Sequence, residues 1–420
     1  MKSRLIAVLA GVVCAALCYS FGPRDVVYDE CFSQLYEVAD CEDFPKAEGA
    51  GKARNVIVII ADGMGVNHVY SSRAYLRGAD SPFAWEELPH SGLVTTCAVG
   101  QITDSAASAT AYSTGHKTRN AVVSMTPLPV MVDVPNMADI IDGRKAIGVV
   151  SNTKVWDATP AAFIAHSEDR GRDRAIARDI VRKTSPELVL GGGRHAFEAL
   201  PQGERMLTLM RDDQLKYAEN AGYTVVGTRE ELAATDPDTT DRMLGLFAPG
   251  AHQFMAERAE DTTEPVLSEM TAFALDMLEE DERGFFLVIE GARIDHASHG
   301  TNFDEMIAEM EEFDRAISLV LGWARDRDDT LILITADHET GDLVVKPGDY
   351  KKGERVEFKW QGEYKPGRTR HSSQRVPVYA VGPNAGAVDD HMDNTEIHCV
   401  IRNALDIDSG KSPVLGGARD

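Results

Sequence analysis

The stretch VIVIIADGMG, residues 56–65, places an unbroken apolar run directly before Asp62. A short apolar run that ends abruptly at polar residues is typical of a strand buried on both faces. Further runs of this kind recur along the chain: AIGVVS (146–151), LVL (188–190), FFLVIE (285–290), LILIT (331–335) and VPVYAVG (376–382). Helical stretches separate them, at 173–183, 264–280 and 302–325. This alternation predicts an α/β fold with a single large, mostly parallel central sheet and helices on both faces.

The strand ends carry most of the candidate site residues, because ligands of such sheets bind outside the carboxyl ends of the strands. Those ends hold the following residues: Asp62, Asp157, Thr159, Glu290, Asp295, His299, Asp337 and His338. One acid at a strand end is ordinarily a helix cap or a turn residue. The same ending on several strands instead favours a cation site, since neighbouring carboxylates repel one another without a cation between them.

The residue types at these ends suit two kinds of metal. In DHASH, Asp295 and His299 are four residues apart and share one face of a helix or turn. The pair at 337–338 offers one oxygen and one nitrogen ligand, and such mixed sets suit zinc. Three other residues offer oxygen alone, which suits magnesium: Asp62, Thr159 and Glu290. His371, within RTRHSSQ, is a weak candidate when taken alone.

The stretch TDSAASATAYSTG, residues 103–115, predicts a helix of small residues that ends at Gly115. Asp104 and Ser105 are both ordinary helix N-caps, and the fragment by itself favours capping. A serine nucleophile needs activation, and no Ser-His-Asp arrangement is visible nearby. Only the full set of strand-end residues favours Ser105 as the nucleophile.

The composition limits which partners the protein can bind and indicates in which compartment it works. The net charge of −24 over 420 residues argues against nucleic acid binding.

The apolar run from Leu5 to Leu17 predicts a signal peptide at 1–22, with an N-terminal membrane anchor as the alternative. No later segment is apolar enough to span a membrane. We expect an irregular leader at 23–54 and one catalytic domain at 55–420. In an exported chain Cys31 and Cys41 are candidates to pair across a short loop, although sequence does not fix connectivity.

Several long motifs occur in the order seen in one known family: ADGMG, TDSAASATAYSTG, DATPAAFIAH followed by Arg170, LVLGGGR, GFFLVIEGARIDHASH, TADHETGD and RHSSQRVPVYAVGP. From about Asn55 to Gly382 the chain resembles the alkaline phosphatases. The resemblance implies hydrolysis of phosphate monoesters at alkaline pH through a phosphoserine on Ser105. It also implies two zinc ions, one magnesium ion and a homodimer.

The resemblance assigns ligands residue by residue, in three sets: Asp295, His299 and His371 for one zinc; Asp62, Asp337 and His338 for the other zinc; and Asp62, Thr159 and Glu290 for magnesium. Arg170 would bind the phosphate, and Asp104 would orient that arginine.

The chain also departs from the family in places. Asp157 matches the acid of well-known bacterial members, whereas His296 matches the histidine of animal members. His296 either influences the third metal and the phosphate through water or is a surface histidine, and both readings stay open. Met255 stands where animal members have a glutamate of their calcium site, so we expect no calcium. The segment between His338 and His371 is too short for their crown insertion.

Two rival functions are a hydrolase of diesters or sulfate esters and an exported binding protein without activity. Arg170 argues against the first, because a clamp on two free oxygens favours monoesters, and the modified Cys or Ser motif of sulfatases is missing. The presence of Ser105, Arg170 and every ligand argues against the second. The glycines at 191–193 lack the Lys and Ser/Thr of a phosphate loop and predict a tight turn.

Overall fold

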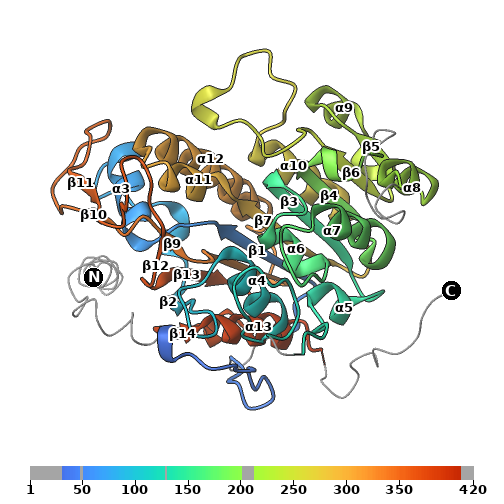
Figure 1. The fold of residues 1–420 in the computed structure, drawn as a ribbon, viewed down its shortest axis with the longest axis horizontal. Helices are drawn as coiled ribbons and strands as arrows, with labels where there is room; N and C mark the ends of the chain where they lie inside the picture. Colours follow the sequence, from blue (N-terminus) through green and yellow to red (C-terminus); the bar gives the residue numbers. More distant parts are fainter. Residues whose placement is uncertain (1–30, 48–50, 128–129, 201–211, 408–420) are drawn as a thin grey trace.

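The computed structural model describes residues 31–47, 51–127, 130–200 and 212–407. A ten-stranded sheet runs through it (Figure 1). Its strands, in their order across the sheet, are β14 (His391–Asp393), β2 (His90–Thr95), β13 (Val376–Val381), β8 (Thr330–Thr335), β1 (Asn55–Ala61), β7 (Phe285–Gly291), β3 (Ala146–Lys154), β4 (Leu188–Gly192), β6 (Met243–Leu246) and β5 (Thr224–Val226). Only β13 is antiparallel to its neighbours, and the other pairs are parallel. The predicted fold class is confirmed.

The middle of the sheet explains why its strands are visible in the sequence. Every residue of β1, β7 and β8 is buried. β1 pairs in parallel with β7 on one side and with β8 on the other. A strand covered on both faces has no polar alternation, so it reads as a continuous apolar run. All six strands predicted from such runs are present.

Helices cover both faces of the sheet. α10 (Leu267–Glu279) and α12 (Phe303–Trp323) pack together on one face, and α10 lies against β3. α4 (Ser105–Thr114) packs between α6 (Ala158–Ile164) and α13 (Asn394–Ala404). Figure 1 shows this second group on the other side of the sheet. Further α-helices are α3 (Val66–Leu76), α5 (Met137–Ile141), α7 (Asp173–Asp179), α8 (Gln214–Asn220), α9 (Arg229–Ala234) and α11 (Arg293–His299).

Two small antiparallel pairings lie outside the main sheet. β10 (Leu343–Val345) pairs with β11 (Phe358–Trp360). β12 (His371–Ser372) pairs with β9 (Glu339–Thr340), which follows β8 directly. The second pairing carries His371 back to the carboxyl end of β8, although more than thirty residues separate them in the chain.

Two disulfides tie the leader to the body of the protein. Cys31 bonds Cys97 and Cys41 bonds Cys399, so the expected pairing of Cys31 with Cys41 is wrong. The reason is that the leader runs alongside residues 115–117, where Val38 forms an antiparallel bridge, and its two cysteines therefore reach different partners.

The expected signal peptide or anchor at 1–22 lies outside the described residues. Within the part of the chain that the structure describes, no helix has the length and apolar character needed to cross a membrane.

Candidate metal centre

The candidate site lies at the carboxyl ends of adjacent strands. Asp62 follows β1, Asp337 follows β8, Glu290 is near the end of β7, and α11 follows β7. Because these strands are neighbours in one parallel arrangement, their ends bring the side chains to one edge of the sheet.

One group consists of Asp295, His299 and His371. The Nε2 atoms of the two histidines are 3.0 Å apart. Oδ1 of Asp295 is 3.4 Å from Nε2 of His299 and 3.7 Å from Nε2 of His371. The other ring nitrogens face backbone carbonyls, those of Thr369 and Thr103, at 3.0 and 2.9 Å. The three ligand atoms therefore converge as they do around a bound cation.

A second group consists of Asp62, Asp337 and His338, all buried. Nε2 of His338 is 3.2 Å from Oδ2 of Asp337 and 3.6 Å from Oδ1 of Asp62. These two carboxylate oxygens are buried without a hydrogen-bond partner. Oδ1 of Asp337, by contrast, accepts from the backbone N–H groups of Gly63 and His338. The unpartnered oxygens fit a metal ligand set, since buried polar atoms otherwise find partners.

The carboxyl groups of this region have raised pKa values. Burial, reinforced by the charge of Asp337, raises the pKa of Asp62 well above its usual range. Burial and the charge of Asp295 raise the pKa of Asp337 to about 7. Burial is also the main reason that the pKa of Glu290 rises to about 8. Several buried carboxyl groups at one edge favour the bound state of a cation, which would supply the missing positive charge.

Oxygen donors make up the third candidate set. Oγ1 of Thr159, at the start of α6, is buried without a hydrogen-bond partner. Oε2 of Glu290 accepts from Oγ of Ser151 at 2.5 Å, and the charge of Glu290 contributes to the raised pKa of Asp62. Donors of oxygen alone suit magnesium better than zinc.

Ser105 is the first residue of α4, and Asp104 is the N-cap. Oδ1 of Asp104 accepts from the N–H of Ala107 at 3.0 Å, so the capping function belongs to the aspartate. Oγ of Ser105 is 3.3 Å from Nε2 of His338, at the second candidate metal group. Gly115 ends the helix with φ of 72°.

Arg170 lies between two carboxylates. One terminal nitrogen is 3.1 Å from Oδ2 of Asp104, and the other is 3.0 Å from Oδ1 of Asp157. Burial alone would lower the pKa of Arg170, but the charges of Asp157 and Asp104 raise it above its usual value. Burial likewise would raise the pKa of Asp157, yet Arg170 and Lys154 hold it below its usual range. The guanidinium is thus fully charged and fixed in orientation.

Some contacts within the site were not predicted from the sequence. Oγ1 of Thr340 donates to Oδ1 of Asp295, and Ser151 donates to Glu290. Nζ of Lys154 is 2.7 Å from Oδ2 of Asp157. Thr340 lies within the motif TADHETGD and could have been suspected on that ground, whereas Ser151 and Lys154 both lie outside the motifs.

His296 belongs to neither candidate metal group among the described residues. Its Nδ1 is 2.9 Å from a terminal nitrogen of Arg293, and its ring is half-buried. That contact does not decide between the two readings of His296.

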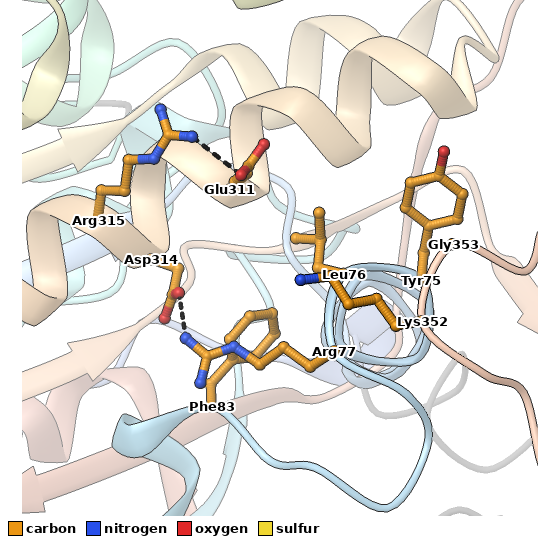
Figure 2. Close-up of a pocket in the computed structure, with 9 residues that line it drawn as sticks. All are labelled: Tyr75, Leu76, Arg77, Phe83, Glu311, Asp314, Arg315, Lys352 and Gly353. Atoms are coloured by element: carbon orange, nitrogen blue, oxygen red, sulfur yellow. Dashed lines mark hydrogen bonds and ion pairs between the residues drawn. The ribbon is translucent and has the colours of Figure 1, made fainter.

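A separate cavity of about 340 Å³ lies between α3 and α12. In it Arg77 pairs with Asp314 and stacks on Phe83, while Arg315 pairs with Glu311 (Figure 2). It contains none of the candidate site residues. Its arginines are already paired, so it offers no comparable chemistry.

Comparison with known proteins identifies the family of this chain. The family model described as alkaline phosphatase matches residues 53–356. Alkaline phosphatase H of Pseudomonas aeruginosa is 30% identical, with 85% of this chain and 86% of that protein covered. Streptomycin-6-phosphate phosphatase of Streptomyces griseus is 33% identical, with 85% and 91% covered.

Solved structures agree. The alkaline phosphatase of the Antarctic bacterium TAB5 has a TM-score of 0.73 and 27% identity, covering 86% of this chain and 100% of that one. A variant of the same enzyme, described with Mg bound in its M3 site, has a TM-score of 0.72, 26% identity and the same coverage. The expected resemblance is therefore confirmed, and the chain belongs to the alkaline phosphatase family as a hydrolase of phosphate monoesters.

Proposed function

We propose that the chain transfers the phosphoryl group of a monoester to Ser105 and then to water, in a site with two zinc ions and one magnesium ion. The observation that carries the proposal is the position of Ser105. Its hydroxyl lies beside His338 of one candidate metal group, and the residue before it, Asp104, holds Arg170.

The candidate metal sets divide by donor type. Asp295, His299 and His371 form one zinc set, and Asp62, Asp337 and His338 form the other, because each mixes imidazole with carboxylate. Asp62, Thr159 and Glu290 form the magnesium set, which the magnesium of the related Antarctic enzyme supports. When bound, such cations lower the pKa of a hydroxyl group and of water and stabilise the charge of the reacting oxygens.

The residues of the chain then have distinct tasks. Arg170 binds two non-bridging oxygens of the phosphate side by side, as guanidinium groups do with phosphate. The free N–H groups at the start of α4 face the same anion. Ser105 attacks phosphorus in line, the P–O bond to the alcohol breaks, and a phosphoserine forms. Water then attacks that phosphorus from the vacated side, which releases phosphate and restores the Ser105 hydroxyl.

We further propose that the protein is exported and forms a homodimer. The two disulfides support export, because such bonds persist in oxidising compartments. The dimer rests on the family resemblance.

The test compares kcat/KM for an aryl phosphate monoester and for the matching diester at alkaline pH, with zinc and magnesium supplied. We expect a strong preference for the monoester that Ser105→Ala abolishes. A preference for the diester would place the chain with the rival hydrolases, and turnover that survives Ser105→Ala would refute the phosphoserine route.

A further inference from the structure

The carboxylate of Asp157 is shared between two cations. Oδ1 is 3.0 Å from a terminal nitrogen of Arg170, and Oδ2 is 2.7 Å from Nζ of Lys154. Oδ1 also accepts from the N–H of Ala158, so Asp157 caps α6 as well. Lys154 therefore does not reach the arginine itself, but it contacts the group that fixes it.

The local backbone aims Lys154 at this carboxylate. It is the last residue of β3, and the register between β3 and β4 shifts between Val150 and Lys154. Irregularities of this kind commonly redirect a side chain near an active site. Nζ of Lys154 also lies 4.9 Å from the centroid of the Trp156 ring.

The Trp156 ring is fixed in turn by the glycine turn after β4. Its Nε1 donates to the carbonyl of Gly193 at 3.0 Å. Gly193 has φ of +87°, and a Cβ added there would lie 2.5 Å from the same Nε1. Only glycine fits at this position, so the support for Lys154 extends to the turn after the neighbouring strand.

The contact between Lys154 and Asp157 changes the net charge around Arg170. Two carboxylates, those of Asp104 and Asp157, face one guanidinium, so these three groups alone carry one net negative charge. Two carboxylates that accept from one guanidinium weaken the attraction of that guanidinium for an anionic phosphate monoester. The ammonium of Lys154 makes the group of four neutral. Its side chain is only 26% exposed, so water screens its charge less than that of a free surface lysine.

We propose that Lys154 is a positioning residue for phosphate: by neutralising the outer oxygen of Asp157 it leaves the remaining N–H groups of Arg170 available to the substrate and to the product phosphate. This inference rests on the proposed function of Arg170 as the phosphate clamp. The competing explanation is a structural ion pair at the end of β3, which would act on stability alone.

The experiment measures Ki of inorganic phosphate and KM of an aryl monoester at low ionic strength, with the full chain loaded with zinc and magnesium. Lys154→Met keeps the packing on Trp156 and removes the charge, Lys154→Arg keeps the charge, and Lys346→Ala removes an exposed lysine that pairs with Glu357. We expect Lys154→Met to raise both constants about fivefold, a size in keeping with one partly screened charge pair. Lys154→Arg and Lys346→Ala should stay near the parent values, and added salt should reduce the difference.

A structural role alone would lower the melting temperature of Lys154→Met without changing Ki, and that result would overturn the proposal. A second test repeats Lys154→Met in the background Asp157→Asn. If Lys154 acts through Asp157, its effect on Ki shrinks there, and an unchanged effect would refute this route. Lys154→Gln replaces Lys154→Met if the latter does not fold. Failure of the parent protein to hydrolyse the monoester would instead count against the proposed function, so the two failures are distinguishable.

Discussion

Nε2 of His299 and Nε2 of His371 lie 3.0 Å apart, and each ring directs its Nδ1 at a backbone carbonyl. A carbonyl only accepts hydrogen bonds, so each Nδ1 carries a proton. Two such nitrogens this close need a positive charge between them, either a shared proton or a bound metal ion. Asp295 completes the set with a carboxylate oxygen.

Removal of metal is therefore expected to destabilise the fold as well as stop turnover. A ligand at a hundred times its dissociation constant stabilises the folded state by about 2.7 kcal/mol. Calorimetry with and without a chelator should show a lower melting temperature after chelation, restored by zinc. The difference should be smaller in His371→Ala. Identical melting curves, together with no metal in the purified protein, would contradict a metal centre.

Asp104 combines two tasks that substitution can separate. Oδ1 caps α4, and Oδ2 accepts from the N–H of Ala121 and from Arg170. Asp104→Ala should lose about 1 kcal/mol of unfolding free energy through the cap, together with phosphate affinity. Asp104→Ser retains a capping oxygen but is too short to hold Arg170, so it should recover part of the stability while KM stays raised. Urea unfolding and steady-state kinetics measure the two effects, and recovery of KM in the serine variant would argue against the orienting role.

The centre of the fold was accessible from the sequence because β1, β7 and β8 are buried on both faces. Strands at the edges were not, since they lack this signature. β2 is only partly buried, and β5 has three residues. The antiparallel direction of β13 is likewise set by long-range packing and leaves no local mark.

The disulfide pairing likewise could not be predicted from the local sequence. Cys41 and Cys399 are 358 residues apart, and only the path of the leader beside residues 115–117 decides their pairing. Local spacing favoured Cys31 with Cys41, and tertiary contacts decided otherwise.

Loss of the bond between Cys41 and Cys399 should destabilise the protein while leaving its chemistry intact. The double replacement Cys41→Ser with Cys399→Ser is expected to lower the unfolding free energy by about 2–4 kcal/mol. Denaturant unfolding with and without reductant measures this change. Reductant should have less effect on the double variant than on the parent protein, and equal effects would be inconsistent with a stabilising bond.

Glu309 should produce a pH dependence of stability away from the metal groups. Burial raises its pKa to about 7, although the N–H of Met255 and the charges of Arg293 and Arg258 oppose the shift. A carboxyl with a raised folded-state pKa stabilises the fold fully below its unfolded value of 4.5, and this contribution is lost as pH rises to about 7. The unfolding free energy of the parent, compared with that of Glu309→Gln, should therefore fall across this window. Parallel curves would exclude the shift.

The residues of the candidate site were easier to predict from the sequence than the neighbouring residues that hold them in place. The resemblance named the residues that converge in both candidate metal groups, because long motifs carry them. Lys154 belongs to none of these motifs. Its contact with Asp157 depends on the irregular register of β3 and on packing against the ring of Trp156. Contacts made by such local geometry are invisible until the backbone is known.

The most direct measurement is mass spectrometry of the protein quenched in acid during turnover of a monoester, with digestion to the peptide that contains Ser105. The proposed route yields that peptide with one added phosphoryl group, located on Ser105 by fragmentation and missing in Ser105→Ala. A turning-over enzyme from which no quench, early or late, yields the phosphorylated peptide, and which transfers no phosphoryl group to an added alcohol, would contradict the phosphoserine intermediate.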